Sequence, residues 1–381
     1  MIKLYLLSLA FLVAAPVFAS SETPEPEIEI APLGLGVHIL YGGNGLGSNV
    51  GVIETSEGLV LVDAMRDRTA DKLRAALATI SDDSVSHVFN THRHEDHTSG
   101  NAGFVSGGAV LVRQASAPDG DEAEQIRFGD KLAVTVGGVR IEAYAVWSHT
   151  PDDALILLPE QNILFMGDTF TTNWHPTFYS GGEAGQLEVI EKALALGNER
   201  TLFVPGHGKV SDRAGLLAYR DGFKAWMARA RALAAAGADA DVMEQDSELA
   251  NIAARFLQDG SQDTIRPTSY RRFIERTIST ELMRLDEAVM ARLSDYAGRY
   301  QYEDGVALEV KVKGRALALY EDDVYAGRII PLSTTRFHYP GALEGEGHME
   351  FDLNDRGHPV SVSSVAGDAR MRAKRVADQG W

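Results

Sequence analysis

The sequence contains no cysteine. This absence excludes disulfides, and it excludes thiolate metal ligands and a cysteine nucleophile from any active site. A metal ion would therefore have to be bound by histidine, aspartate or glutamate. Basic residues are also scarce, because 36 lysines and arginines stand against 54 acidic residues and give a formal net charge of -18. A surface of this charge repels the phosphates of nucleic acids, so we expect a small-molecule substrate and no nucleic-acid partner.

Long apolar runs are missing everywhere except at the N-terminus. The first nineteen residues, MIKLYLLSLAFLVAAPVFA, carry one charge at Lys3, an apolar run from Leu4 to Ala15 and small residues before a cleavage site. The run is too short for a membrane span and is typical of a secretory signal peptide cut after Ala19, with an uncleaved anchor as the alternative. We therefore expect a periplasmic or secreted protein with no stable membrane insertion after cleavage.

The rest of the chain changes character three times. Residues 20–29 are rich in proline and glutamate and predict a flexible lead-in. Residues 30–211 alternate short β-branched runs with helical patterns, which predicts a layered α/β domain. Residues 212–290 repeat apolar side chains at steps of three and four and predict a helical extension. Residues 291–381 alternate around turn sequences and predict a small antiparallel β domain.

One polar stretch stands out within the α/β region. The sequence NTHRHEDHTSGN, Asn90 to Asn101, follows a predicted strand. In an extended segment, His92 and His94 point the same way and can converge on one ion, whereas Asp96 and His97 diverge and suit a second ion. A solvated histidine-rich loop is the alternative. These residues alone are too few for two ions, since each needs at least four ligands.

Further ligand candidates stand at the ends of three later predicted strands. His149 follows YAVWS, Asp168 follows ILFMG, and His207 follows LFVPG. Loops at one end of a sheet can bring distant residues together on a rigid scaffold. With these three side chains the set is large enough for two ions that share a bridging carboxylate.

The motifs THRHEDHTSGN, SHTPDD, ILFMGDTF and VPGHG resemble those of the metallo-β-lactamase-fold hydrolase superfamily in order and separation. The resemblance covers about half the chain, from Gly36 to Gly208, and implies a four-layer αββα sandwich. It implies a first ion bound by His92, His94 and His149, and a second bound by Asp96, His97 and His207. It also implies that Asp168 bridges the two ions.

The strand sequence GLVLVDA resembles the one whose aspartate, here Asp63, supports the metal loop; an ordinary cap of a helix or turn is the alternative role. Arg93 and Glu95 are expected to face outward as support for the loop. Imidazole ligands favour zinc, and a bridging carboxylate suits iron or manganese equally well.

The chemistry expected of such a site is hydrolysis. Two divalent ions can hold a hydroxide at neutral pH and polarise an acyl oxygen. We expect attack of this hydroxide on an ester, lactone, thioester or related acyl centre, with Asp96 as a catalytic proton acceptor. One alternative is a β-lactamase, although Asp168 stands where the class with a cysteine ligand has that cysteine. The alternative of another kind is a metal-binding or ligand-binding module without turnover.

Two further regions carry weaker expectations. The loop after Asp168 holds Trp174, His175 and Tyr179, which are expected to line the substrate cleft unless the loop packs its own aromatics. The C-terminal β domain resembles the lipocalin-like domain of some secreted hydrolases. A stabilising appendage is its favoured role, and the oligomeric state is left open.

Overall fold

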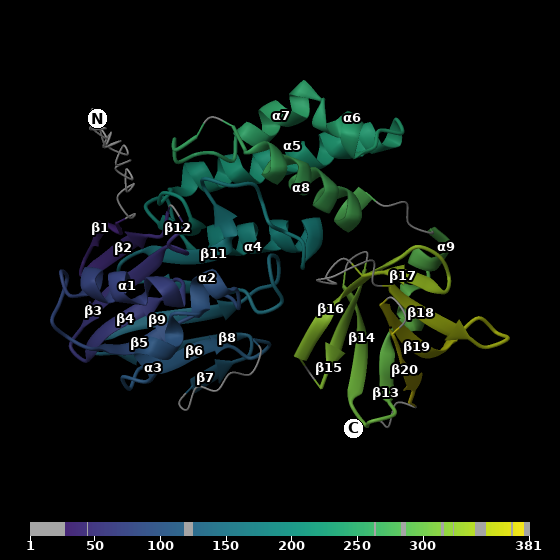
Figure 1. Ribbon diagram of the computed structural model, residues 1–381, viewed down its shortest axis with the longest axis horizontal. Coiled ribbons are helices and arrows are strands. Elements are labelled where there is room, and N and C mark those ends of the chain that lie inside the picture. Colours follow the sequence, from purple (N-terminus) through teal and green to yellow (C-terminus); the bar gives the residue numbers. More distant parts are fainter. Residues whose placement is uncertain are drawn as a thin grey trace, which may run out of the picture.

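The structure, a computed structural model, describes residues 27–43, 45–117, 125–262, 264–282, 287–313, 316–322, 324–339, 348–366 and 369–376. The expected signal peptide and most of the expected lead-in fall within residues 1–26, outside the described residues. Figure 1 shows a sandwich of sheets and helices and a barrel at the C-terminal end.

The first sheet has seven strands in sequence order, antiparallel from β1 to β4 and parallel from β4 to β7. Its strands are β1 (Glu29–Gly34), β2 (Val37–Tyr41), β3 (Val50–Thr55), β4 (Gly58–Val62), β5 (Val85–Phe89), β6 (Val110–Gln114) and β7 (Gln125–Phe128). The second sheet has five strands in the order β12-β11-β10-β9-β8. These are β8 (Lys131–Val136), β9 (Val139–Ala145), β10 (Ala154–Leu158), β11 (Ile163–Thr171) and β12 (Leu202–His207).

Helices cover the outer face of each sheet. The first sheet is covered by α1 (Ala70–Leu77), which follows the short helix η1 (Asp67–Thr69), and by α3 (Asn101–Val105) beyond the one-turn α2 (Glu95–Thr98). The second sheet is covered by the longer helices α4 (Gly182–Leu196) and α5 (Arg213–Ala235), with α6 (Ala240–Glu244), α7 (Ser247–Ala254), α8 (Pro267–Thr277) and the π-helical η2 (Ile278–Leu282) around them. The predicted four-layer αββα sandwich is therefore confirmed.

The period-two alternation of the strands explains how three cores form from two sheets. Successive side chains of a strand point to opposite faces. In β10, Leu155 and Leu157 pack against the helices, whereas Ile156 and Leu158 pack between the two sheets. Both faces are covered, which is why the whole strand ALILL is apolar and buried.

Helix α5 connects the sandwich with the helical extension. Asp212 caps its N-terminus by accepting a hydrogen bond from the Gly215 N–H at 2.9 Å. Its buried face is the one predicted from the spacing of its apolar residues, and Trp226 stacks on Phe273 of α8 with ring centroids 3.9 Å apart. The same face contributes to the core beneath the second sheet. The helical extension thus begins as the outer layer of the sandwich.

The C-terminal region forms a closed antiparallel barrel of eight strands, β13 to β20. After the short helices α9 (Glu287–Met290) and α10 (Leu293–Tyr296), its strands are β13 (Gly298–Tyr302), β14 (Ala307–Lys313), β15 (Ala316–Glu321), β16 (Val324–Pro331), β17 (Arg336–His338), β18 (His348–Leu353), β19 (Pro359–Ala366) and β20 (Ala369–Arg375). Closure removes the exposed sheet edges that invite aggregation. The predicted antiparallel β domain is therefore a filled barrel.

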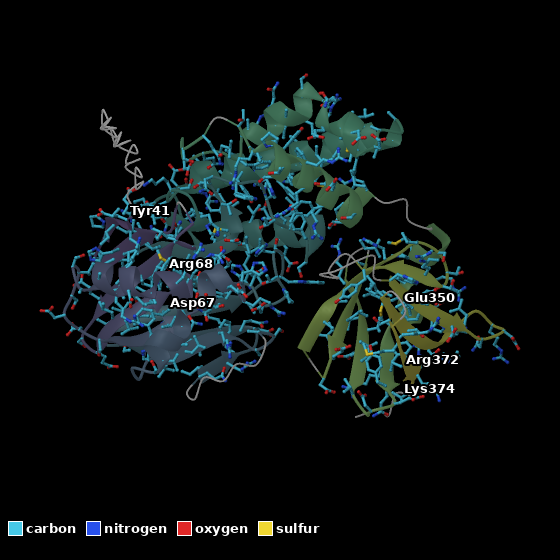
Figure 2. All side chains as sticks on the ribbon, in the orientation of Figure 1. Tyr41, Asp67, Arg68, Glu350, Arg372 and Lys374 are labelled. Carbon is cyan, nitrogen blue, oxygen red and sulfur yellow. The ribbon has the colours of Figure 1, made fainter. Side chains whose placement is uncertain are left out.

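Two serines on the outer face of the barrel are buried because longer side chains of the neighbouring strands cover them. Glu350 and Arg372, labelled in Figure 2, lie on strands β18 and β20, which flank β19. Arg372 Nη2 lies 2.7 Å from Asp352 Oδ2 across β19. Ser361 and Ser363 on β19 are small enough to lie beneath these long side chains and are fully buried.

None of the helices in the described part of the chain has the length and apolar character needed to cross a membrane.

Candidate metal centre

Seven ligand-type side chains meet at one edge of the sandwich. Among the described residues they form two groups, and the ligand atoms within each group lie within 4.8 Å of one another. The first group is His92, His94, His149 and Asp168, and the second is Asp96, His97 and His207. They come from the segments that follow β5 and β9 and from β11 and β12 themselves. These are the residues expected from the sequence, and they divide in the expected way.

The first group converges on His94. Its Nδ1 lies 3.1 Å from His92 Nε2 and 2.9 Å from His149 Nε2. His149 donates its Nδ1–H to the carbonyl oxygen of Thr177 at 2.9 Å, which leaves the lone pair on Nε2. Asp168 Oδ2 lies 3.6 Å from the same Nε2 atom. Three ring nitrogens and a carboxylate oxygen therefore face one point.

The second group shares Asp168 with the first. Asp168 Oδ1 lies 3.2 Å from His97 Nε2 and 3.5 Å from His207 Nε2. His207 Nε2 also lies 3.3 Å from Asp96 Oδ2, and the guanidinium of Arg66 lies 3.7 Å from that oxygen. One carboxylate thus directs each of its oxygens to a different group, which is the geometry of a bridging ligand.

Asp63 orients His97 of the second group through the ring nitrogen that faces away from the cluster. It is buried at the end of β4 with φ of 65°, a left-handed conformation that costs energy for a residue other than glycine. Its carboxylate accepts hydrogen bonds from Thr91 N at 2.8 Å and Thr91 Oγ1 at 2.7 Å, and it lies 2.8 Å from His97 Nδ1. A carboxylate at Nδ1 fixes the imidazole so that Nε2 faces the cluster.

The charges of the cluster favour a bound cation. Burial and the neighbouring imidazoles lower the pKa of His92 well below its ordinary value, and burial lowers the pKa of His149 to about 4. Burial alone would also lower the pKa of His97, but the carboxylates of Asp168 and Asp63 raise it well above its ordinary value. His92 and His149 are therefore neutral, while the carboxylates beside His97 attract positive charge.

Two orphaned atoms test whether the residues fit metal ions. Among the described residues, His97 Nε2 and Asp168 Oδ1 are buried and have no hydrogen-bond partner. Buried polar atoms are nearly always paired, so two such atoms 3.2 Å apart in one cluster need an explanation. A cation bound to the imidazole nitrogen and the carboxylate oxygen would satisfy both atoms. Neutral imidazoles with carboxylates are also the donor set that divalent metals take, so the residues fit a pair of such ions.

Two glycines, because they have no side chain, make room for the candidate ligand Asp168 and for Thr91 beside the ligands. A Cβ on Gly206 would lie 2.1 Å from Asp168 Oδ1, so only glycine lets β12 pass beside that carboxylate. Gly167 adopts φ of 52°, and a Cβ there would lie 2.6 Å from Thr91 Oγ1. Both glycines belong to the motifs that flank the ligands.

Several supporting residues were not predicted from the sequence. Asp153 is buried and accepts hydrogen bonds from Ser148 N at 2.9 Å and His149 N at 2.7 Å; burial raises its pKa to about 7. It belongs to the quoted motif SHTPDD, and an aspartate in a turn that bonds nearby backbone amides was a usable signal. Gln186, which bonds Ser148 from the first turns of α4, has no such signal.

The outward direction predicted for Arg93 is wrong. Its Nε donates to Asp152 Oδ1 at 2.5 Å, and its Nη2 donates to the Ser116 carbonyl at 2.9 Å. Asp152 is buried, so its charge requires a partner. Glu95, by contrast, is exposed at the start of α2. The metal loop is therefore held by an inward ion pair as well as by its own ligands.

The loop after Asp168 packs mostly against itself and α8. His175 is buried, stacks on Phe273 with ring centroids 4.5 Å apart, and accepts a hydrogen bond from Trp174 Nε1 at 2.8 Å. Its Nδ1–H is directed to the carbonyl of Pro176 at 3.0 Å. Trp174 and Tyr179 are partly buried. The substrate-binding role of these three aromatic residues stays a prediction.

Comparisons with known proteins agree on one family. A model of the metallo-beta-lactamase superfamily matches residues 43–243, more than half of the 381-residue chain. A metallo-beta-lactamase type 2 of Bacillus cereus is 29% identical over 205 residues, covering 46% of this chain and 73% of that protein. A hydroxyacylglutathione hydrolase of a Polaromonas species is 28% identical over 164 residues, covering 42% of this chain and 60% of that protein.

A solved structure extends the likeness in fold. The inverting sec-alkylsulfatase Pisa1 from a Pseudomonas species has a TM-score of 0.51 and 19% sequence identity. The matched region covers 71% of this chain and 55% of the sulfatase chain. At this identity the likeness concerns the fold alone.

Proposed function

The chain belongs to the metallo-beta-lactamase superfamily, and we propose that it is a two-metal hydrolase that cleaves an ester, lactone, thioester or related acyl centre. The observation that carries this proposal is the bridging position of Asp168 between two groups of ligand-type side chains. His92, His94 and His149 would hold the first ion, and Asp96, His97 and His207 the second. Zinc is the metal we favour, with iron and manganese as alternatives.

The metal ions would supply Lewis-acid chemistry, lowering the pKa of a water molecule and stabilising charge on the acyl oxygen. The chain's own residues position the ligand side chains. Thr177 and Asp63 fix the tautomers of His149 and His97 through Nδ1. Buried Asp153 holds the backbone amides of the His149 segment in place. These contacts preorganise the ligands before substrate binds.

Asp96 is the residue that we assign as the proton acceptor. Although burial opposes ionisation, the hydrogen bond from His207 and the nearby His97 hold the pKa of Asp96 well below its usual range. Its side chain is 23% exposed, so solvent can reach the ionised carboxylate. The guanidinium of Arg66 lies beside it and favours its ionised form.

A hydrolysis screen tests the proposal. Protein purified without chelator would be assayed on lactones, thioesters, carboxylic esters, phosphoesters and sulfate esters. We expect turnover of an acyl substrate that is lost on chelation and in His94→Ala. The matched control is His38→Ala, because His38 pairs with Glu54 on the surface of the first sheet. Absence of acyl turnover, or turnover that survives His94→Ala, would overturn the proposal.

A β-lactamase is the second candidate, favoured by the 29% identity with the Bacillus cereus enzyme. The absence of cysteine separates this chain from the class of such enzymes with a cysteine ligand. A chromogenic cephalosporin in the same screen decides between the two. Hydrolysis lost in His94→Ala would support the β-lactamase, and no turnover would remove it.

Secretion forms part of the proposal. It rests on the apolar run and the small residues before Ser20. N-terminal sequencing of protein recovered from the native host or a bacterial periplasm should begin at Ser20. A chain that still begins at Met1 would contradict export by cleavage.

A further inference from the structure

A buried ion pair connects the C-terminal barrel with the helices. Arg328 of β16 is only 8% exposed, and its Nη2 donates to the carbonyl of Thr280 at 2.7 Å and to Glu281 Oε1 at 3.2 Å. The side chain of Glu281, in η2, is 10% exposed. A buried pair of this kind fixes geometry, since breaking it leaves an uncompensated charge.

The same ion pair rests on the first turn of α4. Glu281 Oε1 also accepts a hydrogen bond from the Glu183 N–H at 3.1 Å. Gly182 has φ of 69°, and a Cβ there would lie 2.1 Å from Arg328 Nη1 and 2.3 Å from Glu281 Oε1. The arginine and the glutamate therefore lie directly against the backbone at which α4 begins.

One turn further along α4, Gln186 bonds residues that are adjacent in sequence to two candidate ligands. It is fully buried, and both ends of its amide are used. Its Oε1 accepts a hydrogen bond from Ser148 Oγ at 3.0 Å, and its Nε2 donates to the carbonyl of Thr169 at 2.8 Å. Ser148 directly precedes His149, and Thr169 directly follows Asp168. One amide thus holds two segments that supply candidate ligands to the same ion.

The backbone before α4 adds a second connection to the same segment. Gly181 N donates to the Ser148 carbonyl at 2.7 Å, and Ser180 N donates to it at 3.1 Å. Trp147 Nε1 donates to Ser180 Oγ at 2.7 Å. A displacement of the first turn of α4 would therefore move the His149 segment with it.

We propose that Gln186 is a positioning residue for the metal centre and that Arg328 extends this positioning to the barrel. The barrel would hold the first turn of α4 through Glu281, and Gln186 would transmit that position to His149 and Asp168. The inference rests on the proposed two-metal function. Losing a member of a buried hydrogen-bond network leaves its partners buried and unpaired, which costs more than the bond itself.

Cobalt binding tests the proposal without reference to any substrate. The metal-free full-length chain would be titrated with Co²⁺, and the visible spectrum and dissociation constant would be recorded with the thermal unfolding temperature. Loss of a residue that orients metal ligands weakens metal affinity by about 10- to 100-fold. We expect a weakening in this range and an altered spectrum for Gln186→Leu. For Arg328→Leu we expect a smaller weakening, with partial recovery in Arg328→Lys.

Matched controls separate positioning from general stability. Gln258→Leu removes a partly buried amide that bonds the Gly215 carbonyl, and Arg372→Leu removes a barrel arginine on the outer face. Both should bind Co²⁺ as the wild type does. Gln186→Glu keeps the acceptor for Ser148 and loses the donor to Thr169, and it serves if Gln186→Leu does not fold.

The outcomes are distinguishable. If the wild type binds Co²⁺ while the Gln186 and Arg328 variants match its affinity and spectrum, the positioning role is overturned, even if their unfolding temperatures fall. If the wild type itself fails to bind Co²⁺, the two-metal function is overturned instead.

Discussion

At the scale of single residues, the centre depends on side chains that are themselves held in constrained positions. Asp63 adopts a left-handed backbone conformation, and its carboxylate is shared by Thr91 and His97. Such strain persists only where surrounding contacts impose it, and it clusters at functional sites. The ligand groups are therefore preorganised by their neighbours.

Asp63→Asn is predicted to weaken metal binding at the second group. Asparagine tolerates the left-handed conformation, but its amide cannot accept all three hydrogen bonds, so His97 loses its orienting charge. We expect about 10- to 100-fold lower zinc affinity, measured by competition with a chromophoric chelator. Asp71→Asn is the control, because that side chain is fully exposed. Zinc affinity within twofold of the wild type would contradict an orienting role for Asp63.

Gly206→Ala is predicted to displace the bridging carboxylate. The new Cβ would lie 2.1 Å from Asp168 Oδ1, so the side chain or the strand must move. A misplacement of about 1 Å costs on the order of 100-fold in turnover. The kcat for any substrate found in the screen provides the measurement. Gly129→Ala, where a Cβ meets nothing within 4 Å, should retain activity; equal kcat in both variants would disprove the steric argument.

The candidate ligands could be predicted from the sequence because each is a chemically distinctive residue near the end of an apolar run. His149 follows the run that ends in YAVWS, and His207 follows LFVPG. Gln186 and Arg328 could not be found in the same way. Their partners lie 38 and 47 residues away in the chain, at Ser148 and Glu281, and a glutamine or arginine in a helical or strand pattern is usually a solvated residue.

At the scale of elements, strand ends and one loop define the site. Strands such as β4 and β10 give a clear signal in the sequence, because they are buried along nearly their whole length and are apolar throughout. Strand β8 (Lys131–Val136) gives a weaker signal, because exposed and half-buried residues alternate along most of it. The metal loop also differs from the extended segment expected, since residues 95–98 form the helix α2.

The loop between β11 and α4 is predicted to make the protein acid-sensitive through His175. Burial lowers the pKa of His175 to about 4. Below the ordinary histidine pKa of about 6.5, His175 is protonated in the unfolded chain but stays neutral in the folded chain. The free energy of unfolding therefore falls as the pH drops from about 6.5 towards 4. The expected loss between pH 7 and pH 5 is about 2 kcal/mol from this residue.

Urea unfolding of the metal-free protein at pH 7 and pH 5 measures this effect. In His175→Gln the drop in unfolding free energy between the two pH values should be smaller than in the wild type, because glutamine does not titrate. His38→Gln, at a histidine that is 22% exposed, controls for the loss of an imidazole. The same pH dependence in His175→Gln and the wild type would show that His175 is not kept neutral by burial.

At the scale of the whole molecule, the chain forms a sandwich of two sheets with its helices, followed by a closed barrel. The sandwich could be predicted from the sequence because four motifs in order carry the resemblance. Barrel closure could not, since alternation predicts strands but not which strand pairs with β13 to close the ring. The pairing of β13 with β20 joins residues such as Tyr300 and Arg375, which are far apart in sequence.

The net charge of -18 also acts at this scale. A strongly acidic protein attracts cations, and the edge of the sandwich concentrates three aspartates, Asp63, Asp96 and Asp168, beside buried imidazoles. Two divalent ions would carry a charge of +4 beside the -3 of these carboxylates. The folded chain is therefore expected to hold two divalent ions.

Metal quantification by inductively coupled plasma mass spectrometry counts these ions. The protein would be expressed with added zinc and purified without chelators, and its metal content would be divided by the protein concentration from amino-acid analysis. We expect about two divalent ions per chain, as for a co-catalytic pair. Less than one ion per chain would contradict a two-metal centre.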